Sequence, residues 1–176
     1  TPPPWCSRQR SPLRNRSAIA LDLKDPQSIE LVLELIESSD ILPEGFRPGV
    51  MERLGFGYEQ TKAINPGIIY ASISGFGQNG PYSDRPGYDL IGQAMAGAMS
   101  ITGMPGQTPL KSGIPLADVL GGMNGAIGIL GALHYRSLTG KGQQIDVALV
   151  DSIVSSMRAV TMPYFVNGTV AGRSGN

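Results

Sequence analysis

The sequence of 176 residues is poor in cysteine and carries no excess of charge of either sign. Its single cysteine, Cys6, cannot form a disulfide within the chain, and no signal-peptide pattern occurs, which favours a cytoplasmic setting. Its 14 basic and 14 acidic residues give a formal net charge of zero. This balance excludes a global attraction to nucleic acid or to an anionic membrane, so we expect neither as a partner.

Long apolar runs and metal-binding patterns are also missing. The longest apolar stretch, residues 119–133, is shorter than the roughly 18 residues that cross a bilayer, and we interpret it as a buried helix. Within it, Gly121 and Gly125 have a spacing that lets another backbone approach closely. His134 has no carboxylate or cysteine at ligand spacing, and no zinc motif, P-loop or GxGxxG pattern occurs. We therefore expect no metal ion.

The beginning of the chain differs in composition from the rest. Residues 1–14 are rich in proline and arginine and have no periodic apolar pattern, which predicts an irregular arm. Residues 15–176 are then expected to form one partial domain. Within it, the short apolar run 17–23 predicts a strand. Asp25 and Pro26 follow as a helix start, as N-cap and first helical residue, and the apolar spacing predicts a helix to about residue 38.

Short apolar runs and helical patterns alternate along the remaining chain. Further strands are predicted at 40–42, 68–73 and 143–148, and helices at 50–54, 58–64, 88–100, 115–138 and 150–160. The run 68–73 is continuously apolar, as is typical of the interior of a parallel sheet. This order predicts an α/β fold, a Rossmann-like, doubly wound, mostly parallel sheet with flanking helices.

Asp118 lies at the junction of a loop with the most apolar helix, in the segment IPLADVLGG. An aspartate in this place ordinarily caps the helix by accepting a hydrogen bond from a backbone amide. Alternatively, its carboxylate could attack an activated carbonyl, with Gly121 and Gly122 leaving room for a substrate. The two roles compete for the same oxygens, and position alone favours the cap.

Four other polar residues have ordinary explanations when each is taken singly. Tyr88 and Asp89 follow a Pro-Gly turn at the start of a predicted helix, where tyrosine usually packs and aspartate usually caps. Lys24 and Arg53 are single cations near the ends of predicted elements, and such side chains are normally solvated. By themselves, these residues assign no chemistry to the chain.

Five segments taken together resemble a known family. They read DLKDPQSIELVLELIESSDIL, FRPGVMERLGFGYE, INPGIIYASISGFGQNGPYSDRPGYDL, PLADVLGGMNGAIGILGAL and TGKGQQIDVALVDS. In order and spacing they are similar to the family III CoA-transferases of the CaiB/BaiF type, a superfamily that includes formyl-CoA transferase and the 2-methylacyl-CoA racemases. The resemblance covers about four-fifths of the chain, from roughly Asn15 to Met157, and indicates an internal fragment of such a protein.

The resemblance implies roles for individual residues. Asp118 corresponds to the catalytic aspartate, which in the transferases attacks an acyl-CoA thioester to give a mixed anhydride. The released CoA converts the anhydride to an enzyme thioester, and an acceptor carboxylate then takes the CoA. Contacts with coenzyme A are implied for Leu21, Lys24, Phe46, Val50, Arg53 and Tyr88. The family usually has asparagine before this phenylalanine, where this chain has Gly45, so one polar contact to CoA is expected to be missing.

Three functions stay open from the sequence. The first is acyl-CoA:carboxylate CoA transfer, with an acyl-CoA and a carboxylic acid as partners. The second is 2-methylacyl-CoA racemisation, but the racemases use a histidine where this chain has Tyr88, and a tyrosine side chain, with an ordinary pKa of about 10, is a poor base at pH 7.

The third is a catalytically inactive oligomeric protein, because family members are about twice this long and form interlocked dimers. A homodimer is expected for all three functions. Relative to the family, the sheet would lack its first strand, and an unpaired sheet edge invites dimerisation.

Overall fold

The computed structural model describes residues 15–175 and is built around a three-stranded sheet. Strands β1 (Ile41–Glu44), β2 (Ile69–Ser74) and β3 (Gln143–Ala148) lie in the order β1-β2-β3, and both pairs are parallel. The predicted α/β class with a parallel sheet and flanking helices is confirmed. The arm predicted at residues 1–14 lies outside the described residues.

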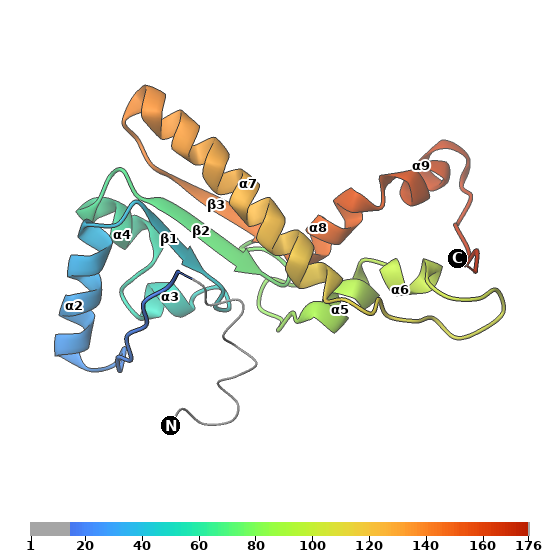
Figure 1. Ribbon diagram of the computed structural model, residues 1–176, viewed down its shortest axis with the longest axis horizontal. Coiled ribbons are helices and arrows are strands. Elements are labelled where there is room, and N and C mark those ends of the chain that lie inside the picture. Colours follow the sequence, from blue (N-terminus) through green and yellow to red (C-terminus); the bar gives the residue numbers. More distant parts are fainter. Residues whose placement is uncertain (1–14, 176) are drawn as a thin grey trace.

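Helices connect these strands and flank the sheet (Figure 1). They are α2 (Pro26–Glu37), α3 (Val50–Arg53), α4 (Tyr58–Ile64), α5 (Asp89–Met95), α6 (Ala98–Ile101), α7 (Leu116–Thr139), α8 (Leu149–Ser156) and α9 (Arg158–Asn167). In Figure 1, α2, α3 and α4 gather on one side of the sheet, while the long α7 runs along β2 and β3 on the other.

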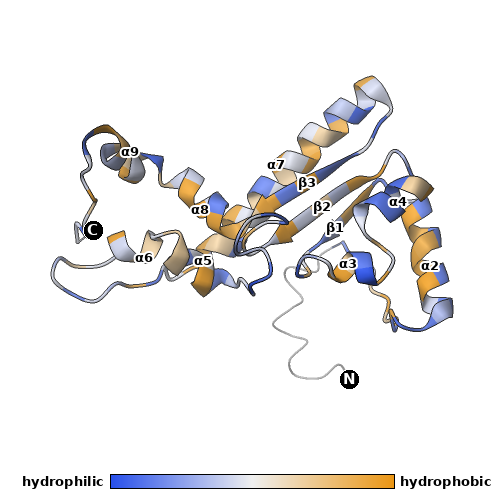
Figure 2. Cartoon of the chain, turned by 180° about the vertical axis from the view of Figure 1, so that it is seen from behind, coloured by the Kyte–Doolittle hydropathy of each residue, from blue (hydrophilic) through white to orange (hydrophobic). Residues whose placement is uncertain are grey.

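The first face of the sheet is covered by apolar side chains from α2 and α3. One buried cluster contains Ile36 of α2, Met51 of α3, Phe56 from the turn between α3 and α4, and Tyr70 of β2. Figure 2 shows orange and blue residues alternating along α2, as expected for a helix with one side on a core. The helix begins as predicted, because the side chain of Asp25 accepts a hydrogen bond from the backbone amide of Ser28 in the first turn.

The second face is covered by α7, whose small residues allow a close approach to the sheet. A β-carbon at Gly125 would lie 2.7 Å from Ile73 Cδ1, and one at Gly128 would lie 2.9 Å from Ile145 Cγ2. Both distances are shorter than an ordinary carbon–carbon contact. The close packing expected at Gly125 is therefore present, although it is made by a side chain of β2 rather than by a backbone, and Gly128 makes a similar contact with β3 that was not predicted.

The outer side of α7 differs from the prediction of a buried helix. Its large apolar residues Met123, Ile127, Leu130 and Leu138 are exposed. By length and composition alone α7 could also cross a membrane, a property that it shares with core helices of α/β proteins. Its inner side packs on the parallel sheet, so we assign α7 to the layer that covers this face.

The prediction of a strand at residues 17–23 is wrong. This segment has no regular strand structure, and Ile19 within it is 63% exposed. A strand requires a neighbour to complete its hydrogen-bond ladder, and in the described part of the chain β1 pairs only with β2. β1 also extends past its predicted end and includes Pro43, which an edge strand tolerates because one side of its backbone is unpaired within residues 15–175.

Two predicted helices are each divided in the structure. The helix predicted at 88–100 is interrupted at Gly97, whose φ of 86° is in the left-handed region, so α5 and α6 are separate. The helix predicted at 150–160 is interrupted at Met157, with φ −92° and ψ 20°, and becomes α8 and α9.

Candidate active site

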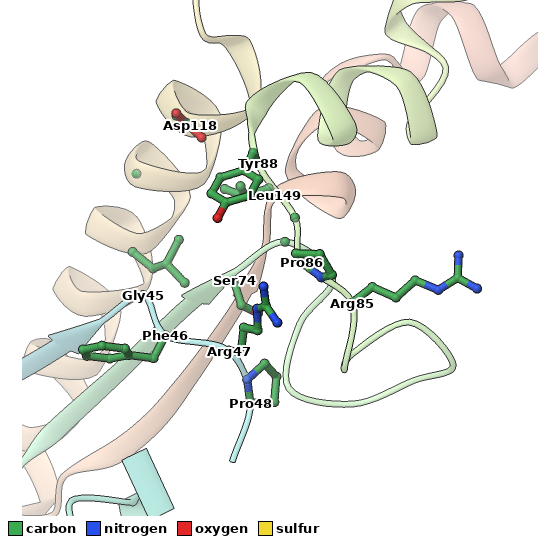
Figure 3. Close-up of a pocket in the computed structure, with 14 residues that line it drawn as sticks. Gly45, Phe46, Arg47, Pro48, Ser74, Arg85, Pro86, Tyr88, Asp118 and Leu149 are labelled. Atoms are coloured by element: carbon green, nitrogen blue, oxygen red, sulfur yellow. The ribbon is translucent and has the colours of Figure 1, made fainter. Parts of the chain in front are cut away.

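A cavity of about 360 Å³ lies at the edge where the parallel strands end (Figure 3). Gly45 and Phe46 follow β1, Ser74 is the last residue of β2, and Leu149 follows β3. Ser74 is paired with Ala148, so β2 and β3 end side by side. Open parallel sheets bind ligands at this carboxyl edge.

The start of α7 and the segment before α5 complete the cavity. Asp118 and Gly122, four residues apart, lie on the same side of α7 and line the cavity, and Tyr88 lines it from the segment before α5. A β-carbon at Gly122 would meet no atom within 4 Å, so this glycine leaves room for a substrate as expected. Gly121 does not, because it is buried against the side chain of Leu149.

Asp118 does not cap its own helix, so that interpretation is wrong. It is the third residue of α7, whose N-cap is Pro115 with no side-chain capping bond. The capping oxygen comes instead from Asp89, whose Oδ1 accepts from the amide of Ala117 at 2.8 Å and lies 3.5 Å from the amide nitrogen of Asp118. In residues 15–175 the carboxylate of Asp118 accepts no hydrogen bond and is available for chemistry.

The surroundings of Asp118 also change its acidity. Partial burial of the carboxyl group raises its pKa above the ordinary value, and the nearby Asp89 carboxylate raises it further. A raised pKa makes the ionised carboxylate a stronger base and a better nucleophile than a freely solvated aspartate. The chemistry suggested by the sequence therefore has a physical basis in the structure.

The residues predicted to contact CoA fall into two groups. Phe46 and Tyr88 line the cavity together with Asp118. The other four lie elsewhere in the fold: Leu21 and Lys24 precede α2, and Val50 and Arg53 are the first and last residues of α3. All six contacts stay predictions.

Sequence reasoning missed two arginines that line the cavity. Arg47 follows Phe46 after β1 and lines the cavity, as Ser74 does (Figure 3). Arg85 extends away from the centre and stacks on the ring of Tyr82, with its guanidinium carbon 4.1 Å from the centroid. Arg47 is the third residue after β1, and a cation soon after a strand of a parallel sheet is a signal that could have identified it.

In residues 15–175 no group of three or more His, Cys, Asp or Glu side chains could hold a metal ion. His134 is exposed on α7.

Residues 9–176 match CoA-transferase family III. The chain belongs to this family. It is 44% identical over 164 residues to acetyl-CoA:oxalate CoA-transferase of Acetobacter aceti, a match that covers 93% of this chain and 42% of that protein. It is 40% identical over 163 residues to succinyl-CoA–D-citramalate CoA-transferase of Chloroflexus aurantiacus, covering 93% of this chain and 40% of that one.

Solved structures that are similar in sequence to this chain have the same fold. A CaiB/BaiF family protein from Brucella suis is 42% identical, with a TM-score of 0.87, and the match covers 90% of this chain and 42% of that one. Rv3272 from Mycobacterium tuberculosis is 33% identical, with a TM-score of 0.81, and the match covers 87% of this chain and 42% of that one. The chain thus spans about two-fifths of the length of the curated relatives and structures that it matches.

Proposed function

We propose that this chain carries the nucleophile and part of the coenzyme A site of an acyl-CoA:carboxylate CoA-transferase. The observation that carries the proposal is the position of Asp118, whose carboxylate accepts no hydrogen bond in residues 15–175 and lines the cavity at the carboxyl edge of the sheet. Membership of CoA-transferase family III supports the reaction class.

In the proposed reaction, an oxygen of Asp118 attacks the thioester carbonyl of an acyl-CoA. The carbon–sulfur bond breaks, and CoA leaves as a thiolate from a mixed anhydride between the acyl group and Asp118. The thiolate then attacks the Asp118 carbonyl carbon, releasing the original acyl group as a carboxylate and leaving an aspartyl-CoA thioester.

The second half of the reaction repeats these steps with the acceptor. The acceptor carboxylate attacks the aspartyl thioester and displaces CoA as a thiolate, which gives a new mixed anhydride. Attack of the thiolate on the acceptor's carbonyl carbon forms the new acyl-CoA and returns Asp118 to its carboxylate form. No proton or electron is gained or lost over the cycle.

Two other cavity residues suit the charges in this cycle. The hydroxyl of Ser74 is buried and has no hydrogen-bond partner within residues 15–175. Because a buried polar group without a partner is costly, this hydroxyl is suited to a substrate oxygen. Arg47, which lines the same cavity, provides a positive charge for a carboxylate or an oxyanion.

The proposal can be tested by trapping the aspartyl thioester. The protein is incubated with acetyl-CoA or succinyl-CoA and hydroxylamine, and peptides are examined by mass spectrometry for a hydroxamate on Asp118. We expect the hydroxamate in the wild type and its absence in Asp118→Asn. Asp151→Asn is the matched control, because Asp151 is also an exposed third residue of its helix, α8, and lies outside this cavity.

The outcomes separate the three functions that the sequence left open. A hydroxamate on another residue, or trapping that persists in Asp118→Asn, would overturn the assignment of the nucleophile. Loss of deuterium from the α-carbon of a 2-methylacyl-CoA, without trapping, would indicate racemisation. A wild-type protein that binds CoA by calorimetry but is neither trapped nor active in deuterium exchange would support an inactive protein.

A further inference from the structure

Asp89 is the first residue of α5, yet its carboxylate is bound to the start of α7. Oδ1 accepts a hydrogen bond from the amide of Ala117 at 2.8 Å and lies 3.5 Å from the amide nitrogen of Asp118. Oδ2 accepts from Nε2 of Gln93 at 2.7 Å. Asp89 thereby joins one turn of α5 to the turn of α7 that carries the proposed nucleophile.

Gln93 extends this connection to the loop that precedes α7. Its side chain is 1% exposed, and its Oε1 accepts from the amide of Ser112 at 2.8 Å. Its Nε2 also donates to the carbonyl oxygen of Ile114 at 3.3 Å. Buried polar groups that are fully hydrogen-bonded fix one arrangement of their surroundings. The loop and the helix start are therefore held by the same two side chains.

Backbone packing brings the two helices close enough for these bonds. A β-carbon at Gly92 would lie 2.8 Å from Cβ of Ala117, and both residues are buried. Any larger residue at position 92 would push α5 away from the first turn of α7. Gly92, the side-chain amide of Gln93 and the carboxylates of Asp89 and Asp118 thus belong to one structural unit.

The start of α7 leaves Asp118 without its usual capping partner. In a capping box, an acidic side chain at the third helical position reaches back to the backbone N–H of the N-cap residue. Here the N-cap is Pro115, which has no N–H. The next free amides, at Ala117 and Asp118, face the carboxylate of Asp89.

We propose that Asp89, supported by Gln93, is a positioning residue that binds the free amides of α7 and so keeps the carboxylate of Asp118 in the cavity. This inference rests on the proposed function of Asp118, but the positioning itself can be measured without turnover. Asp89 has a second effect on the same group, because its charge adds to burial in raising the pKa of Asp118. Arg47, Arg85 and Tyr88 are the other charged or titratable residues that line this cavity.

Two substitutions separate the hydrogen bond from the charge. Asp89→Ala removes both, whereas Asp89→Asn keeps an oxygen that can accept from Ala117 but removes the negative charge and, because an NH2 group replaces Oδ2, the bond from Nε2 of Gln93. The matched control is Asn65→Ala, since Asn65 also anchors a helix end from another element, donating to the carbonyl oxygens of Ile36, Glu37 and Ser39. Asn65 does not line the cavity, so this control reports the effect of destabilisation alone.

Amide hydrogen exchange and the titration of Asp118, both followed by NMR, provide readouts that do not depend on activity. In Asp89→Ala we expect exchange at Ala117 and Asp118 to become about tenfold faster or more, because a hydrogen bond to a charged acceptor is lost. In Asp89→Asn we expect this exchange to stay near the wild-type rate, while the pKa of Asp118 falls towards its ordinary value. Asn65→Ala should leave the titration of Asp118 unchanged, and should leave exchange at the amides of Ala117 and Asp118 unchanged relative to the other amides of α7.

Kinetics then connect positioning with the reaction. We expect Asp89→Ala to lower kcat with little change in KM for acyl-CoA, and Asp89→Asn to recover part of the loss. Unchanged exchange and titration in both Asp89 variants would overturn the positioning role, whatever the activity of the wild type. A wild type without CoA transfer, combined with the expected NMR changes, would overturn the proposed function and leave the positioning role intact.

Discussion

Replacing Gly87 with alanine should destabilise the protein through a clash between two backbone segments. Gly87 precedes Tyr88 in the wall of the cavity and lies against Gly75, which directly follows β2. A β-carbon on Gly87 would overlap Cα of Gly75 and lie 3.2 and 3.3 Å from its carbonyl carbon and its nitrogen. All three atoms belong to the backbone, so no side-chain rotation can relieve the contact.

The size of the effect follows from this geometry. Overpacking a well-filled site ordinarily costs about 1–3 kcal/mol, and the upper end applies where only the backbone can move. For a chain of this size, each kcal/mol lowers the midpoint of thermal unfolding by about 2–4 °C. We therefore expect Gly87→Ala to lose about 3 kcal/mol and about 6–12 °C.

Gly122→Ala is the matched control for the same cavity. The new β-carbon at position 122 would meet no atom within 4 Å, and alanine is favoured over glycine inside a helix by about 0.5–1 kcal/mol. Urea unfolding followed by circular dichroism should therefore show Gly87→Ala less stable, and Gly122→Ala slightly more stable, than the wild type. Equal stability of Gly87→Ala and the wild type would refute the close contact of the two segments.

Three further predictions concern other parts of the fold. Arg136→Ala should lower the free energy of unfolding by about 1–3 kcal/mol in urea titrations, because Arg136 bonds the Asp40 carboxylate at 2.8 Å and two backbone carbonyls. Asp25→Ala should cost about 1 kcal/mol in the same assay, because the bond at 3.0 Å from the Ser28 amide is lost. Since the pKa of Asp118 is raised in the folded state, this residue contributes stability below its unfolded pKa of about 4 and loses that contribution as pH rises through the folded pKa. Asp118→Asn should therefore be more stable than the wild type at neutral pH, with a gain that shrinks as pH falls through the folded pKa and is almost gone below about pH 4, measured by urea titrations over a pH series.

Local signals in the sequence predicted most of the fold. Asp25 and Pro26 marked the start of α2, and the strand predicted at 143–148 has the observed bounds of β3. The errors have non-local causes. The run 17–23 has the composition of a strand but no neighbouring strand among the described residues, and the conformation of Gly97 divides a helix that apolar spacing alone made continuous.

The candidate site was only partly predictable for the same reason. Asp118, Phe46 and Tyr88 stood in segments that resembled a family, and the structure brings all three to one cavity. Arg47 and Ser74 were missed, because each becomes significant only when β1 and β2 end at the same edge. No sequence spacing indicates contact between segments that far apart.

The contact between α5 and α7 explains why two aspartates at helix starts have different roles. Each has the residue type and position of an ordinary cap, and the sequence offered a capping interpretation for both. The structure gives the cap of α7 to Asp89, from outside the helix, while Pro115 removes the amide that Asp118 would otherwise bind. The helix amides are then satisfied by one carboxylate, and the other is left with a raised pKa beside an open cavity. Moving the cap back to Asp118 would stabilise its charge and reduce its nucleophilicity, so the proposed catalysis depends on the helix start being satisfied by Asp89.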